Sequence, residues 1–150
     1  MVKKFLLLVI LSIISFHGYA DIYTEDAFLI LCNADILYMI NKEQVLAFVI
    51  ILENENAEDI FIDLLERSRS GTGKFYALLG IFNINFNRYI EIKETIDLSE
   101  EVMRQIFDIN ISTLNIRTLA QLIVSIENGS WIRNVKSVFE IPNTVIWQNL

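Results

Sequence analysis

The sequence predicts an all-α, mainly helical protein in which short antiparallel helical hairpins form either an irregular bundle or a short solenoid. Two observations lead to this prediction. Residues 21–150 contain one proline and four glycines, so few positions interrupt regular structure. Apolar residues recur at helical spacing in segments of about 9 to 16 residues, and the connections between these segments are about two to eight residues long. Such short connections indicate that consecutive helices pack side by side.

The first twenty residues have the three-part pattern of a secretory signal peptide. Lys3 and Lys4 precede an apolar run over residues 5–16, and small residues lead to a cleavage site after Ala20. This run of twelve residues is too short for a membrane-spanning helix, which needs about 20, although a short membrane anchor is the alternative. We therefore expect residues 1–20 to be a signal peptide and residues 21–150 a single helical domain, exported to the periplasm or secreted, with no membrane span after cleavage.

The first half of the mature chain predicts helices over residues 25–40, 42–52 and 57–69. Thr24, Asn41 and Asn56 precede these segments and are residue types that cap helix N-termini. The third segment has acidic residues in its first turn and arginines in its last, as the helix dipole favours. Residues 45–52 are apolar all round, so a buried strand is the alternative there.

The second half predicts a turn over residues 70–73 and helices over residues 74–82 and 86–96, the latter capped by Asn85. Residues 97–100 have the pattern of a capping box and predict a helix extending to Phe107. Residues 109–114 alternate apolar and polar side chains and form a loop or a short strand. A last helix is expected over residues 116–127, ended by Gly129. The tail, residues 131–150, is β-branched and aromatic, and extended structure, a short helix and a hairpin all remain open for it.

Residues 57–96 resemble a helical hairpin of the HEAT or armadillo type. The resemblance rests on FIDLL at 61–65 and GKFYALLG at 73–80, where a Gly/Ser turn leads into an aromatic–Ala–Leu–Leu–Gly core strip. It covers about 40 of the 130 mature residues, and no second copy follows at a fixed period. Arrays of this type need about three repeats, and three hairpins fit into this length. The resemblance implies a surface for binding rather than a catalytic site.

Composition excludes several classes of function. After cleavage the chain has no histidine, one cysteine (Cys32), and 10 basic against 19 acidic residues, a net charge of −9. Catalytic arrangements that need histidine and zinc sites of Cys and His are thereby excluded, as is an internal disulfide. The negative charge argues against binding to nucleic acid. We expect no cofactor, no metal and no enzymatic activity, although an enzyme that uses only carboxylates is a minor alternative.

Four features of the sequence are candidate sites. The run GTGK at 71–74 does not match the phosphate-loop pattern, because Ser68 stands where a glycine is needed and Phe75 where Ser or Thr is needed. We therefore expect a helix–helix turn there. Glu91 and Glu94 are better explained as surface ion pairs than as paired catalytic carboxylates. For Cys32 we expect a buried inert thiol, with an intermolecular disulfide as the alternative. The two tryptophans, Trp131 and Trp147, are expected in the core, with an interface as the alternative.

The densest charge feature is an acidic stretch between residues 53 and 66. Its candidate partner-binding residues are Glu53, Glu55, Glu58, Asp59, Asp63 and Glu66. A solvated helix face, a docking patch for a basic protein, and a weak metal site at Asp59 and Asp63 are the three interpretations.

We therefore expect an exported, non-enzymatic protein-binding protein of the cell envelope, for example an immunity or inhibitor protein that occupies a basic toxin or hydrolase. The alternative is a structural or assembly protein of the envelope, homo-oligomeric through an apolar surface.

Overall fold

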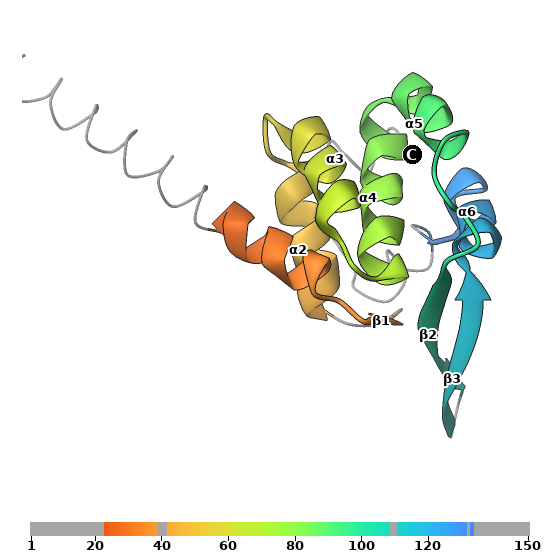
Figure 1. The fold of residues 1–150 in the computed structure, drawn as a ribbon. Coiled ribbons are helices and arrows are strands. Elements are labelled where there is room, and N and C mark those ends of the chain that lie inside the picture. The colour runs from red at the N-terminus through yellow and green to blue at the C-terminus, as the bar shows by residue number, and fades with distance from the viewer. Residues whose placement is uncertain (1–22, 39–41, 109–110, 132, 134–150) are drawn as a thin grey trace, which may run out of the picture.

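The chain is mainly helical, as predicted, and a small sheet stands beside its helices (Figure 1). The computed structural model describes residues 23–38, 42–108, 111–131 and 133. The predicted signal peptide and most of the tail, Trp147 included, lie outside the described residues. The elements are a helix over 23–32, β1 (Ile36–Tyr38), α2 (Lys42–Leu52), α3 (Ala57–Arg67), α4 (Gly71–Ile84), α5 (Phe86–Lys93), β2 (Glu101–Asp108), β3 (Ile111–Thr118) and α6 (Leu119–Glu127).

Several predicted helices are confirmed, and local capping chemistry explains some of their ends. The run at 45–52 is helical, because α2 covers the whole predicted segment. The Asn85 side chain accepts a hydrogen bond from the backbone N–H of Arg88 and caps α5. Asn56 stands at the N-cap of α3, but its side chain makes no cap hydrogen bond. Gly129 has a φ of +66° just past α6, which is the left-handed conformation that favours glycine after a helix.

The predicted helix over 25–40 is too long. The helix ends at residue 32, and Ile36–Tyr38 form β1, which pairs in parallel with β2. The pairing places Ile36 opposite Met103 and Tyr38 opposite Gln105. The local sequence favours a continuous helix here. The backbone hydrogen bonds that β1 makes with β2 replace the helical hydrogen bonds that are lost when the helix ends early.

The helix predicted from residue 97 to Phe107 is wrong, because this segment forms β2. The Asp97 carboxylate accepts hydrogen bonds from the N–H and hydroxyl of Ser99, so the capping-box residues close a turn instead of starting a helix. β2 then pairs antiparallel with β3, from Glu101 opposite Thr118 to Asp108 opposite Ile111. The strand alternative is therefore correct for residues 111–114, whereas residues 109–110 lie outside the described residues, and the last helix begins at Leu119 rather than at 116.

The turn predicted at 70–73 belongs largely to α4. Ser70 is the N-cap, since its hydroxyl oxygen accepts a hydrogen bond from the N–H of Gly73, and the helix starts at Gly71. A Cβ at Gly71 would lie 2.7 Å from Cγ2 of Val102. Glycine therefore lets the first turn of α4 approach the beginning of β2 closely.

α4 lies at the centre of the core, between α3 and the elements of the C-terminal half (Figure 1). The Phe61 ring of α3 packs on the backbone of Gly80, and Phe75 and Tyr76 contact Trp131 edge-on, with ring centroids 5.0 and 6.3 Å apart. Trp131 is buried, which confirms its predicted place in the core. The hairpin of α3 and α4 lies where the helical-repeat resemblance places one, but after α5 the chain enters the β2–β3 hairpin and leaves the helical pattern.

Candidate functional site

The six acidic residues predicted as a partner-binding surface do not form one patch. Glu53 and Glu55 are exposed in the turn between α2 and α3. Asp59 and Asp63, one turn apart on α3, face the helix over 23–32. Glu58 instead points toward α5, where it accepts hydrogen bonds from the Asn85 amide at 3.1 and 3.3 Å. The sixth, Glu66, borders a second cleft beside α4 and α5, defined below.

A groove of about 420 Å³ separates the helix over 23–32 from α3, and we call it the acidic groove. Thr24 and Asn54 are joined across it by a hydrogen bond of 3.2 Å from the Asn54 amide. Its lining residues are Thr24, Glu25, Phe28, Asn54, Asn56, Asp59, Ile60, Asp63 and Arg67. The groove therefore combines carboxylates and side-chain amides with one buried aromatic ring.

Three carboxylates and one guanidinium set the charge of the acidic groove. Arg67 pairs with Asp63 at 3.0 Å, and its guanidinium lies 4.8 Å from the centroid of the Phe28 ring. Glu25 and Asp59 are exposed and form no ion pair with a described residue. The pair of Asp63 and Arg67 thus leaves two carboxylates to attract a cation.

The surroundings reinforce this charge. Residues 23–66 contain ten acidic residues and a single basic one, Lys42, whereas residues 67–133 contain seven acidic and eight basic residues. The three helices of the acidic part, over 23–32, α2 and α3, lie together on one side of the molecule (Figure 1). Negative potential is therefore concentrated on the side of the molecule where the groove lies.

Sequence reasoning missed the contribution of Glu25. It did not connect this residue with the acidic stretch at 53–66, because the two are far apart in sequence. The absence of arginine and lysine from residues 23–41 is the signal that would have joined the two segments.

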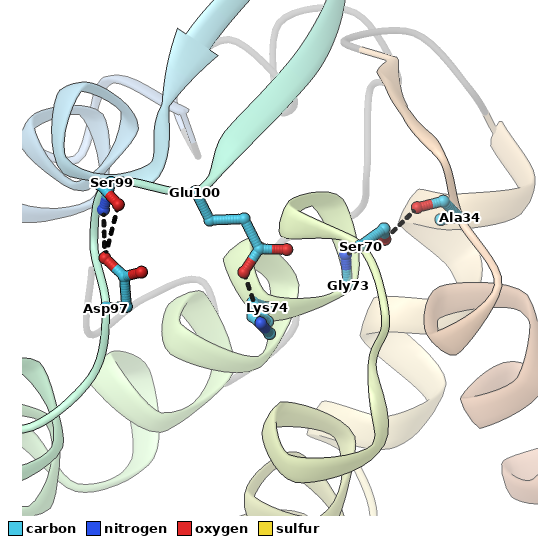
Figure 2. A network of polar contacts seen from close by, with 7 residues as sticks. All are labelled: Ala34, Ser70, Gly73, Lys74, Asp97, Ser99 and Glu100. Carbon is cyan, nitrogen blue, oxygen red and sulfur yellow. Dashed lines mark hydrogen bonds and ion pairs between the residues drawn. The ribbon is translucent and has the colours of Figure 1, made fainter.

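A second cleft, of about 440 Å³, lies between α3, α5 and the segment before β2, and its charges are balanced. Glu66 and Asp97 face Lys74 and Arg88 across walls of isoleucine and leucine. Figure 2 shows Lys74 pointing from α4 to Glu100, with which it forms an ion pair. The same view shows Ser70 donating a hydrogen bond of 2.6 Å to the carbonyl of Ala34. These contacts join the start of α4 to the segment before β1 and to the segment before β2.

Four of the five polar side chains that line this cleft have structural partners among the described residues. The hydrogen bonds from the hydroxyl and the N–H of Ser99 lower the pKa of Asp97. Lys74, which had suggested a phosphate loop, is occupied by Glu100, and the backbone before it is the first turn of α4. The cleft therefore offers no free cation to a phosphate at this position.

The remaining candidate sites from the sequence show no arrangement for catalysis or metal binding among the described residues. Glu91 pairs with Arg88 at 3.0 Å, which confirms a surface ion pair, while Lys93 pairs with Glu127. Cys32 is a free thiol, and it is half-buried rather than fully buried. Within the described ranges, no three histidine, cysteine or carboxylate side chains gather as metal ligands. The weak metal site considered at Asp59 and Asp63 gains no third ligand there.

The chain was compared with models of protein families, with curated proteins and with solved structures, and nothing matches. Among the described residues, no helix combines the length and the apolar character that crossing a membrane requires. The acidic groove is consequently interpreted from its own chemistry alone.

Proposed function

We propose that this protein is an exported, non-enzymatic binding protein of the cell envelope that occupies a basic partner protein through the acidic groove. The observation that carries the proposal is the segregation of charge, with ten acidic residues and one basic residue over 23–66. Opposite charge speeds encounter between proteins and disfavours wrong partners. An immunity or inhibitor protein that faces a basic toxin or hydrolase is the concrete form of this function.

The groove is suited to an arginine or lysine side chain of the partner. Such a side chain has an apolar stem, which Phe28 and Ile60 would contact, and a charged end, which Glu25 and Asp59 would accept. Asp63 compensates the charge of Arg67, so the unpaired carboxylates of Glu25 and Asp59 disfavour an anionic ligand in the same place. Exposed carboxylates at Glu53 and Glu55 extend the negative field beyond the groove.

The first test is a pull-down of the tagged protein from its native envelope fraction at low and high salt, read by mass spectrometry. We expect one stoichiometric basic protein that is retained at low salt and lost at high salt, since exposed charge pairs are screened within about 10 Å at 0.1 M. Recovery of the tagged protein without a basic partner would contradict the proposal.

A matched pair of variants then tests the groove itself. The groove variant carries Glu25→Gln and Asp59→Asn, and the control carries Glu94→Gln and Glu101→Gln; all four side chains are exposed and both variants remove two negative charges. We expect association with the captured partner to slow about tenfold in the groove variant, with a smaller salt dependence. Equal association rates for both variants would place the interface elsewhere.

The alternative function is a structural protein that self-associates through an apolar surface, for which the tail with Trp131 and Trp147 is one candidate. Trp131 is not available for such an interface. Trp131 is 3% exposed and packs against Phe75 and Tyr76, so it is committed to the core. Trp147 lies outside the described residues. Self-association therefore needs another apolar surface, and the β2–β3 hairpin provides one.

A further inference from the structure

β3 is an edge strand of the three-stranded sheet, whose order is β1-β2-β3. The β2–β3 hairpin projects from the body of the molecule, on the side away from α3 (Figure 1). Three large apolar side chains on one face of this hairpin are exposed: Leu114 by 60%, Ile116 by 57% and Met103 by 39%. Met103 lies opposite Ile116, and Leu114 is two residues along the same face.

At the outer edge of β3, the backbone groups of Leu114 and Ile116 have no strand partner among the described residues. The N–H of Leu119 donates to the carbonyl of Glu100 at 2.8 Å, so the pair 100/119 is a hydrogen-bonded pair of the antiparallel ladder. Because hydrogen-bonded pairs alternate along such a ladder, Arg117 and Asn115 direct their backbone groups toward β2. The N–H and C=O groups of Leu114 and Ile116 consequently point outward, away from every described strand.

The edge lacks several of the features that usually prevent pairing with another strand, and its one charged residue is Arg117. β3 has no proline and no lysine, and its register with β2 runs through all eight residues without a bulge. An eight-residue edge with two exposed aliphatic side chains is open to a further strand.

We propose that β3 pairs antiparallel with β3 of a second copy of this chain, about a twofold axis at Asn115. In this register Leu114 lies opposite Ile116 of the second copy, and Ile116 lies opposite Leu114, so four aliphatic side chains form one cluster beside the two Met103 residues. Arg117 lies opposite Thr113 and does not meet its own copy. The outward backbone groups of Leu114 and Ile116 then satisfy one another across the axis.

The lack of net charge on the hairpin favours a second copy of this acidic chain as the occupant of the edge. Residues 101–118 contain two acidic and two basic residues and are neutral, whereas residues 23–66 carry a net charge of −9. Two copies that meet at the hairpins keep their acidic helices at opposite ends of the dimer, where like-charge repulsion is weakest. The proposal is independent of the acidic groove, which stays open in this dimer.

The mass of the purified, cell-processed protein tests the proposal when it is measured by light scattering over a range of concentrations. We expect a concentration-dependent rise toward twice the mass of one chain. Ile116→Lys should raise the dimer dissociation constant at least about tenfold, because it places two ammonium groups in the apolar cluster. The matched control is Val124→Lys on α6, whose side chain is 58% exposed, and it should leave the dimer unchanged. A wild-type protein that stays monomeric, or equal weakening by both variants, would overturn the proposal.

A cysteine at the proposed axis tests the register. In a Cys32→Ala background, Asn115→Cys should form a disulfide-linked dimer under mild oxidation, because this residue faces its own copy in a closely spaced pair. Adding Ile116→Lys should abolish the cross-link. A cross-link that persists in this triple variant would contradict the register.

Hydrogen exchange separates a second copy from the chain's own residues 134–150 as the occupant. If a second copy covers the edge, protection of the Leu114 and Ile116 amides rises with protein concentration. Protection that is high at every concentration would mean that residues of the same chain cover the edge, and the dimer proposal would be wrong.

Discussion

The central helix α4 and the β2–β3 hairpin are both rich in large apolar residues. Those of α4 are mostly buried, whereas several of those in the hairpin are exposed. In α4, ten of fourteen residues are buried, among them Leu78 and Leu79. In the hairpin, Val102 is buried at the base, while Met103, Leu114 and Ile116 are exposed. Apolar side chains in α4 stabilise the fold, whereas those along the outer hairpin are available to a partner. Apolar character alone therefore does not distinguish core from binding surface in this chain.

Truncation of one leucine in each region gives the largest expected contrast. Leu78→Ala should lower the free energy of unfolding by about 3 kcal/mol, because it removes a fully buried side chain and leaves a cavity. Leu114→Ala should change it by less than about 0.5 kcal/mol. Denaturant unfolding of dilute protein measures both values without a contribution from association. Similar losses in the two variants would mean that the hairpin face is packed against something.

A methyl group added to α4 tests how tightly the centre is packed. In Gly80→Ala the new Cβ would lie 2.3 Å from Cδ2 of Phe61, a ring that is itself fully buried. We expect a loss of about 2 kcal/mol, even though alanine has the higher helix propensity by about 1 kcal/mol. Gly80→Ala combined with Phe61→Leu should recover part of this loss, and the melting curves of the two variants check that order. Stabilisation by Gly80→Ala would show that α3 and α4 are less closely packed.

The ion pair of Lys74 and Glu100 joins the two regions, so its removal should loosen the hairpin from α4. Both side chains are partly buried, at 30% and 25% exposure. Lys74→Met keeps the aliphatic stem and should cost about 1 kcal/mol, because it leaves the Glu100 carboxylate without its cation. Arg88→Met, which breaks the more exposed pair with Glu91, is the control and should cost less. Thermal unfolding ranks the two variants.

The smallest expected effect concerns the turn before β2 and depends on pH. Hydrogen bonds from Ser99 lower the pKa of Asp97 in the folded protein. Asp97 therefore contributes stability that is complete above its unfolded pKa, about 3.9, and is lost as the pH falls through the lower folded pKa. Asp97→Ala should destabilise the protein slightly at pH 7, and its difference from the wild type should shrink below about pH 4. A difference that is constant from pH 7 to pH 3 would exclude this titration.

The candidate site was predictable only in part. Sequence order placed Asp59 and Asp63 together, because residues four apart share a helix face. The sequence did not show that Glu58 and Glu66 lie apart from Asp59 and Asp63. Their separation depends on which side of α3 faces the helix over 23–32. Glu25 and Phe28 enter the groove only through packing across about thirty residues of sequence, which no local pattern encodes.

The sequence by itself determined the helical class, the starts of α2, α3 and α5 and the acidic character of residues 23–66. These depend on composition, on apolar spacing and on caps such as Asn85, whose effects act within one turn. Tertiary structure decided the sheet. Ile36–Tyr38 became a strand because β2 offers it backbone partners, and residues 101–108 became a strand because β3 pairs along their whole length. Backbone hydrogen bonds within a helix are local, whereas those of a sheet join residues far apart, and only the folded chain brings them together.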